Sequence, residues 1–285
     1  MDPMPDGDLA RIGVSISPVG VTSTDWLAAA ERLAGAGYGT IWAWDHFMGH
    51  GDPTTPVLEA FTILVTASER IRAARIGTLV TNVMNRHPAV LARMASTVQD
   101  VSGGRFRLGL GIGGNPREHA AYGIPFPEPR ERAEHLVEAI AILRGLWAGG
   151  PFSYDGRHYR LADAYARPIP SPPPPIIVGA QSPAGVRIAA AHADGWAAEL
   201  PSFRELKDRY LEALDAAGRD RGSQTVVLGF NAARRLGETV LDTAWTHAPR
   251  ETLAVWRERG MDEAALAVRT ADEVRALVAA AESGR

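Results

Sequence analysis

The chain has 285 residues, of which 46% are hydrophobic and 22% charged, and its formal net charge is −3 at pH 7. These values exclude a disordered chain and disfavour nucleic acid as the main partner, and no apolar run reaches the roughly 20 residues that cross a bilayer. The absence of cysteine excludes disulfides and thiolate metal sites and makes the cytoplasm the expected location.

Eight short apolar runs along the chain are predicted to be strands, at 11–17, 40–45, 75–82, 105–113, 175–180, 195–200, 225–231 and 264–268. Continuous apolar runs, rather than alternating ones, are typical of parallel strands that helices cover on the outside. Stretches with helical spacing of apolar residues follow the strands, at 25–36, 55–70, 88–101, 129–147, 183–193, 203–217, 250–260 and 271–282. Thr24 is the expected N-cap of the first helix, and Gly37 its end. Eight such units predict a (β/α)₈ TIM barrel.

The domain organisation predicted from these elements is a flexible leader at residues 1–10, without signal-peptide features, and one barrel at 11–285. An insertion is expected at 148–174. Its first part, FSYDGRHYRL, alternates around Asp155-Gly156, which is a strong hairpin signal. Its second part holds six prolines in eight positions and must be extended.

The active site of a TIM barrel lies at the C-terminal ends of its strands, which here draws attention to Asp45-His46. A carboxylate beside an imidazole can supply an acid or base near neutral pH, although His46 could instead hydrogen-bond a loop. Glu118 and His119 could line the same mouth or cap a short helix after the fourth strand. The chain has no HxH or HExxH motif, so no metal site is predicted.

Glycines follow the fourth and fifth strands. Residues 109–114 match G-x-G-x-x-G, but three βα units precede them, which disfavours a Rossmann fold. At this strand end, Gly113 and Gly114 are interpreted as allowing a bulky ligand to approach. The run Gly179-Ala180-Gln181-Ser182 precedes a helix that starts with proline. Its N–H groups could bind a phosphate, or the run could be an ordinary tight turn.

Four segments carry a resemblance to a known family: GYGTIWAWDHF at 37–47, TLVTNVMNRHPAVLARMASTVQDVSGGRFRLGLGIG at 78–113, REHAAYGIPFPEPRERAEHL at 117–136 and PPPPIIVGAQSPAGVRIAAAHADGW at 172–196. In these segments the chain resembles the luciferase-like monooxygenase superfamily, and within it the branch of coenzyme F420-dependent oxidoreductases. The resemblance implies a bacterial luciferase-like barrel whose mouth holds a deazaflavin or flavin ring. It also implies, by family analogy, a homodimer.

The resemblance assigns roles to particular residues. It implies a bulge at Thr78-Leu79-Val80, often built around a non-proline cis peptide, on which the ring rests. It further implies that Asn82 contacts the ring or its tail. Residues 179–182 match the family's phosphate-binding turn, and Asp45-His46 matches a pair beside the redox centre. At 113–115 the chain reads Gly-Gly-Asn where many relatives have Trp and some have a catalytic Glu.

The predicted function is hydride transfer between F420 and a small organic substrate, with His46 as acid or base and Asp45 orienting it. Arg86 and Arg187 are candidates to attract the carboxylates of the F420 tail. The alternatives are an FMN-dependent monooxygenase and a non-catalytic flavin-binding barrel.

Overall fold

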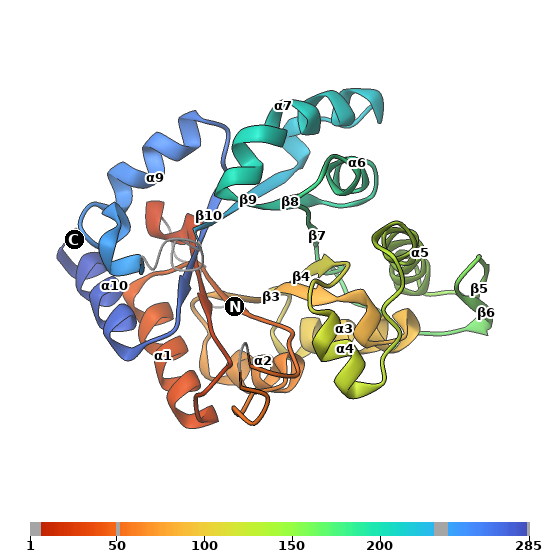
Figure 1. The fold of residues 1–285 in the computed structure, drawn as a ribbon, viewed down its shortest axis with the longest axis horizontal. Coiled ribbons are helices and arrows are strands. Elements are labelled where there is room, and N and C mark those ends of the chain that lie inside the picture. Colours follow the sequence, from red (N-terminus) through yellow and green to blue (C-terminus); the bar gives the residue numbers. More distant parts are fainter. Residues whose placement is uncertain (1–6, 50–51, 231–238, 284–285) are drawn as a thin grey trace.

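The computed structural model describes residues 7–49, 52–230 and 239–283 (Figure 1). Eight parallel strands form a closed barrel in the order β1-β10-β9-β8-β7-β4-β3-β2. They are β1 (Ile12–Ile16), β2 (Thr40–Ala43), β3 (Arg75–Asn82), β4 (Phe106–Gly111), β7 (Ile176–Gly179), β8 (Gly195–Glu199), β9 (Thr225–Phe230) and β10 (Glu263–Val268). The predicted TIM barrel is therefore confirmed. Every strand lies within its predicted segment except β10, which starts one residue earlier, and Asn231 lies outside the described residues.

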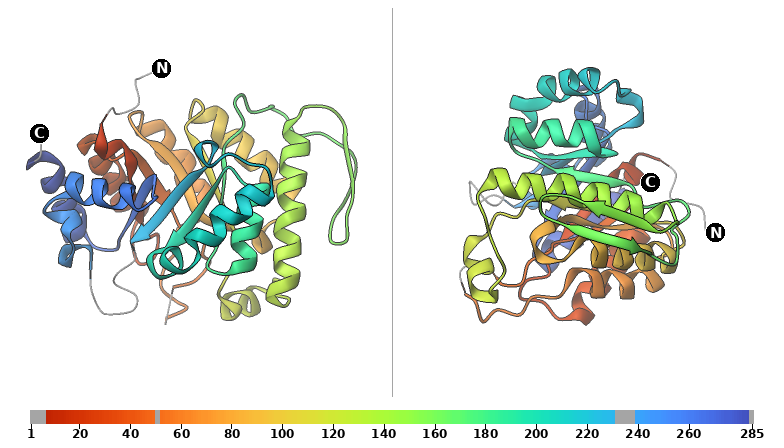
Figure 2. Two further views of the ribbon diagram at one scale, coloured as in Figure 1. Left: turned by 90° about the horizontal axis from the view of Figure 1, so that it is seen from above. Right: turned by 90° about the vertical axis from the view of Figure 1, so that its right-hand side faces the viewer.

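Helices cover the outside of the barrel (Figures 1 and 2). They are α1 (Ser23–Ala36), α2 (Ala60–Arg70), α3 (Pro88–Val101), α4 (Pro116–Tyr122), α5 (Pro129–Trp147), α6 (Pro183–His192), α7 (Leu200–Ala216), α9 (Pro249–Glu258) and α10 (Ala271–Ser283). None of these helices combines the length and apolar character that a membrane span requires.

Four helix starts differ from the sequence prediction: α7 and α9 begin at Leu200 and Pro249 rather than at residues 203 and 250, and α1 and α2 also differ. The N-cap of α1 is Thr22 rather than Thr24, because the Thr22 hydroxyl accepts a hydrogen bond from the N–H of Asp25. Helix α2 begins at Ala60 rather than at residue 55, because the Glu59 carboxylate caps the helix by accepting from the first backbone N–H groups. Gly37 ends α1 in the left-handed conformation, as expected.

Parts of the two segments outside the predicted barrel repeat have defined structure. A 3₁₀ turn, η1 (Asp8–Arg11), buries Leu9, so residues 8–10 of the expected flexible leader belong to a folded turn. Residues 1–6 lie outside the described residues. Between α5 and β7, the strands β5 (Phe152–Asp155) and β6 (Arg160–Ala164) form an antiparallel hairpin beside α5 (Figure 2).

A bulge interrupts β3 where the family resemblance implies it. The pairing of β3 with β4 shifts register between Thr78 and Thr81, and the Leu79–Val80 peptide bond is cis. The Thr78 hydroxyl donates to the Gly109 carbonyl at 3.0 Å, and the Thr81 hydroxyl donates to that of Thr78 at 2.8 Å. The expected bulge and its non-proline cis peptide are confirmed, and the cis bond is the second of the two.

Glycines of β4 and β7 provide the space that this bulge occupies. A Cβ on Gly111 would lie 2.7 Å from Val80 Cγ2, and one on Gly179 would lie 2.9 Å from Val80 Cγ1. A Cβ on Gly109 would overlap the Thr78 carbonyl oxygen. These glycines therefore make room for the bulge of β3. The sequence interpretation, in which glycines at this strand end let a ligand approach, does not include this role.

Replacing Gly109 with Ala is expected to lower the free energy of unfolding by about 1–3 kcal/mol, the usual cost of overpacking. The clash is with a backbone oxygen, which cannot rotate away. Gly35→Ala is the matched control: nothing lies within 4 Å of an added Cβ in α1, and alanine favours a helix by up to about 1 kcal/mol. Denaturant unfolding of both variants checks this. Equal stability of Gly109→Ala and wild type would contradict the tight fit.

Candidate active site

Asp45 holds together the ends of β2 and β3 at the C-terminal mouth of the barrel. The Asp45 residue is 3% exposed, and its carboxylate accepts a hydrogen bond from the backbone N–H of Asn82 at 3.0 Å. Arg86 donates to both of its oxygens, at 2.7 and 2.9 Å, and the Asn85 amide donates at 3.3 Å. These contacts correct the prediction that Asp45 orients His46: the carboxylate is engaged by the loop after β3.

The Arg86 guanidinium lies between two carboxylates and two aromatic rings. It pairs with Glu59 at 2.7 Å as well as with Asp45, and it stacks near Phe47 and Phe61. Burial acts to lower the pKa of Arg86, but its bonds to Asp45 and Glu59 outweigh burial, and the pKa rises. Its charge is thus neutralised within the protein, and the suggestion that Arg86 attracts a cofactor tail is not supported by its position.

The carboxylate that His46 meets is Glu118, from the first turn of α4. Glu118 Oε2 lies 3.1 Å from His46 Nδ1 and accepts from the Met48 N–H at 3.4 Å. The Glu118 side chain is 2% exposed, whereas that of His46 is 29% exposed. Asn115 caps α4 by accepting from the Glu118 N–H. With Nδ1–H donated to Glu118, the other ring nitrogen, Nε2, becomes the atom that can exchange a proton with a ligand.

Glu118 is held in its charged form. Burial acts to raise its pKa, but the hydrogen bond and charge of His46 and the N–H groups of Phe47 and Met48 outweigh burial, so the net pKa is lowered. A buried ionised carboxylate behind a partly exposed imidazole is the arrangement that orients a general acid or base. The sequence alone does not show that Glu118 is the partner of His46, because the two residues lie 72 positions apart.

Asn82 supports the mouth from within. Its Nδ2 donates to Asn85 Oδ1 at 3.1 Å and lies 2.7 Å from His119 Nε2, while its Oδ1 accepts from the Met84 N–H. Burial lowers the pKa of His119 and outweighs the opposite influence of Glu118, which favours the neutral ring. Because both ends of the Asn82 amide bind protein groups, the implied contact with a cofactor ring or tail is not supported; Asn82 positions the loop.

The two glycines after β4 differ in their surroundings. A Cβ on Gly113, which has φ +76°, would lie 2.6 Å from Asn82 Nδ2, so this glycine packs against the loop after β3. Nothing lies within 4 Å of a Cβ on Gly114. Of the pair, Gly114 therefore keeps the open space expected for a ligand.

The bulge itself offers an apolar surface. Leu79 and Val80 are half-buried, although their neighbours along β3 are buried. Leu79 packs on a cluster of side chains inside the barrel, formed by Trp42, Ile177, Ala197, Val227 and Ala265. This surface is apolar and is held from below, as a platform for a planar ring must be.

In the turn after β7, Gly179 and Ala180 are held by the sheet, whereas Gln181 and Ser182 are exposed to solvent. Ala180 is buried, and its N–H and C=O are bonded to Ala197 and Trp196; Gly179 pairs within the sheet. Gln181 and Ser182 are exposed at the first turn of α6, where the Ser182 hydroxyl accepts from the N–H of Gly185. A helix N-terminus attracts anions, so Gln181 and Ser182 fit a phosphate, whereas Ala180 supports the turn.

The residues at the mouth fit a deazaflavin or flavin. The Leu79–Val80 surface suits an apolar tricyclic ring, the open space at Gly114 leaves room beside it, and the exposed start of α6 suits a phosphate. Fold and site thus define a parallel (β/α)₈ barrel whose mouth carries a His–Glu pair and an apolar bulge.

The chain belongs to the luciferase-like monooxygenase family, whose sequence pattern matches residues 9–283. It is 32% identical over 232 residues to an F420-dependent hydroxymycolic acid dehydrogenase of Mycobacterium tuberculosis, a match covering 81% of this chain and 63% of the relative. It is 31% identical to an F420-dependent glucose-6-phosphate dehydrogenase of Beutenbergia cavernae, with 76% and 65% covered. A pyrimidine monooxygenase, RutA, of Enterobacter cloacae is 33% identical, with 72% and 55% covered. The chain thus spans less than two thirds of the length of these curated relatives.

Solved structures of low sequence identity share the fold. An F420-dependent secondary alcohol dehydrogenase superposes with a TM-score of 0.73 at 20% identity, over 96% of this chain and 90% of the other. The F420-dependent tetrahydromethanopterin reductase of Methanopyrus kandleri gives 0.75 at 17% identity, over 95% and 97%.

Replacing Asp45 with Asn is expected to destabilise the fold because Arg86 loses a buried partner. Breaking a buried pair costs about 3–5 kcal/mol, and we expect the lower end because Glu59 still pairs with Arg86. Asp155→Asn, which removes an exposed ion pair with Arg160, is the control and should leave the free energy of unfolding unchanged. If the two variants are equally stable in urea, Asp45 is not the structural anchor described.

The contribution of Glu118 to stability should depend on pH. Because its folded-state pKa is lowered, its stabilisation is present above the ordinary carboxyl pKa and is lost as pH falls through the folded-state pKa. The difference in unfolding free energy between wild type and Glu118→Gln should therefore hold from pH 7 down to the ordinary carboxyl pKa of 4.5 and shrink as pH falls further, toward 3. A difference that stays constant over the whole of this range would argue against an ionised Glu118.

Proposed function

We propose that the protein is an F420-dependent oxidoreductase that transfers a hydride between the deazaflavin and a small organic substrate. The observation that carries this proposal is the His46–Glu118 pair, which stands at the same mouth as the Leu79–Val80 bulge. The F420-dependent dehydrogenases that are 31–32% identical to the chain support the choice of cofactor.

Each part of the mouth has a role in this proposal. Leu79 and Val80 would support the ring, and Gln181 and Ser182 would bind the phosphate. F420 would supply or accept the hydride when bound. His46 would donate or accept the substrate proton at Nε2, and Glu118 would position the imidazole from Nδ1 and stabilise its charged form.

Asp45 and Asn82 take part as positioning residues. Asp45 joins the loops after β2 and β3, and Asn82 joins the loop after β3 to α4 through His119. Both therefore act on the placement of His46 and Glu118 rather than on a substrate. Homodimerisation and a cytoplasmic location stay predictions from the sequence.

An FMN-dependent monooxygenase is the second candidate. The 33% identity to a pyrimidine monooxygenase favours it. The platform and the phosphate turn suit both cofactors. F420 is distinguished by the carboxylates of its tail, and exposed Arg187 on α6 offers a positive charge near the phosphate turn.

Titration of the cofactor-free protein with F420 and with FMN separates the two functions. Trp42 lies beneath Leu79, and Trp44 is half-exposed after β2, so ring binding should quench tryptophan fluorescence. We expect F420 to bind more tightly than FMN. Tight FMN binding without an F420 response would favour the monooxygenase.

His46→Ala should lower turnover by about 10²–10⁴-fold, the usual contribution of a positioned acid or base, while F420 affinity changes far less. The assay follows F420 reduction with a panel of secondary alcohols and sugar phosphates. His247→Gln, at an exposed histidine elsewhere, is the control. Wild-type turnover in the His46 variant would remove the proposed acid or base.

A further inference from the structure

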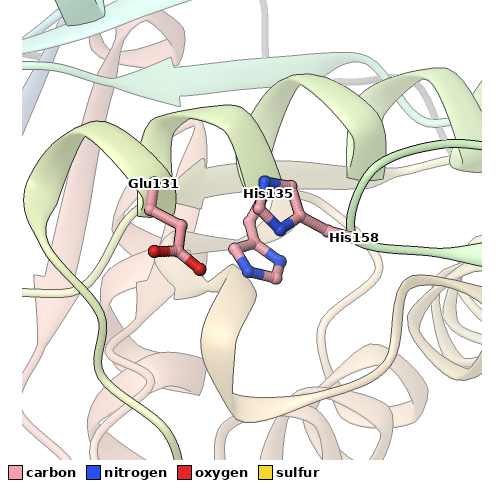
Figure 3. A group of neighbouring side chains, drawn as sticks. All are labelled: Glu131, His135 and His158. Carbon is pink, nitrogen blue, oxygen red and sulfur yellow. The ribbon is translucent and has the colours of Figure 1, made fainter.

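Three side chains of types that bind metals meet where the hairpin of β5 and β6 lies beside α5, and none of them belongs to the His46–Glu118 pair. Glu131 and His135 lie four residues apart on α5, so they share one face of the helix. His158 comes from the turn between β5 and β6. Figure 3 shows the Glu131 carboxylate directed toward the two imidazole rings.

The ligand atoms of these three residues are already close. One atom of each lies within 4.8 Å of the others, and the two rings stack with centroids 3.9 Å apart. Zinc bonds of about 2.0–2.1 Å in a tetrahedral site place ligand atoms roughly 3.3 Å apart. To close the difference, the exposed Glu131 carboxylate moves inward and the two stacked rings turn so that their in-plane lone pairs converge on one ion.

Each imidazole has a second partner of the kind that metal-bound histidines use. His135 Nδ1 lies 2.9 Å from the Tyr159 hydroxyl, and His158 Nε2 lies 3.2 Å from Glu134 Oε2. When these nitrogens carry the proton and donate it, His135 Nε2 and His158 Nδ1 keep their lone pairs for a metal. Such partners fix the tautomer and the ring orientation of metal ligands.

The hairpin that carries His158 is fastened to α5. The Glu138 carboxylate accepts backbone hydrogen bonds from Arg157, His158 and Tyr159, at 2.8–3.3 Å. Arg157 also pairs with Glu134 at 2.7 Å. The third ligand is therefore held beside the helical pair before any metal arrives.

A cavity of about 590 Å³ borders the cluster, and Glu131, His135 and Tyr159 form part of its wall. Three protein ligands leave a fourth position of a tetrahedral ion open to water or to another ligand. Because Glu131 and His135 face the cavity, this position would be reached from it.

We propose that Glu131, His135 and His158 bind one divalent transition-metal ion, with Zn²⁺ as the best match, and leave one coordination position open to the cavity. Two imidazole nitrogens and one carboxylate oxygen are a donor set that Zn²⁺ accepts. The absence of HxH and HExxH motifs does not exclude this site, because its third ligand, His158, comes from the hairpin and not from a short sequence motif.

The test is calorimetric titration of the full chain, freed of metal by a chelator that is then removed, with ZnCl₂. We expect one ion per chain. Affinity should fall by about 100-fold or more in His158→Gln and in Glu131→Gln, which remove ligands, and by about 10-fold in Glu134→Gln, which alters a shared partner of His158 and Arg157. His247→Gln is the matched control and should bind as wild type does.

Two further measurements separate binding from folding. Circular dichroism should show wild-type structure in Glu131→Gln, whose side chain is exposed. Co²⁺ in place of Zn²⁺ should give the visible absorption of a four-coordinate ion in wild type and lose it in that variant. Absence of stoichiometric binding by wild type, or equal affinity in Glu131→Gln and His247→Gln, would overturn the proposal. These outcomes do not depend on hydride transfer, so they are distinct from a failure of the proposed function.

Discussion

The buried Asp45 carboxylate sets the arrangement of the barrel mouth. It accepts two bonds from Arg86 and one from the Asn82 N–H, so the chain after β2 and the chain after β3 are held as one unit. A buried carboxylate must find such partners, because an unpaired charge away from water is costly. With Asp45 committed to β3, the next residue, His46, meets Glu118 of α4 instead.

A steric constraint shapes the adjacent part of the mouth, at the ends of β3, β4 and β7. The bulge in β3 displaces Val80 toward β4 and β7, and only glycine at positions 111 and 179 leaves the space that its methyl groups fill. Leu79 and Val80 consequently stay half-buried at the strand end rather than fully covered. An apolar platform and an imidazole backed by a buried carboxylate together suit hydride transfer coupled to proton transfer.

The fold could be predicted from the sequence because parallel barrel strands are buried on both sides and read as short apolar runs. The bulge at residues 78–80 could be predicted from the family resemblance. Its packing against glycines could not, because that packing depends on how β3, β4 and β7 align with one another. The partner of His46 could not be predicted: adjacent residues such as Asp45 and His46 suggest a pair, yet Glu118 enters from a helix 72 residues later. The start of α2 was missed for a related reason, since its cap is a glutamate side chain rather than a usual N-cap residue.

A crystal structure of the chain with F420 would show whether the bulge and the His46–Glu118 pair serve one bound cofactor. We predict that the deazaflavin ring lies against Leu79 and Val80, that its phosphate contacts Ser182, and that His46 keeps its bond to Glu118 with Nε2 facing the space beside the ring. A ring bound away from the bulge, or a His46 imidazole turned from the ring, would contradict this prediction.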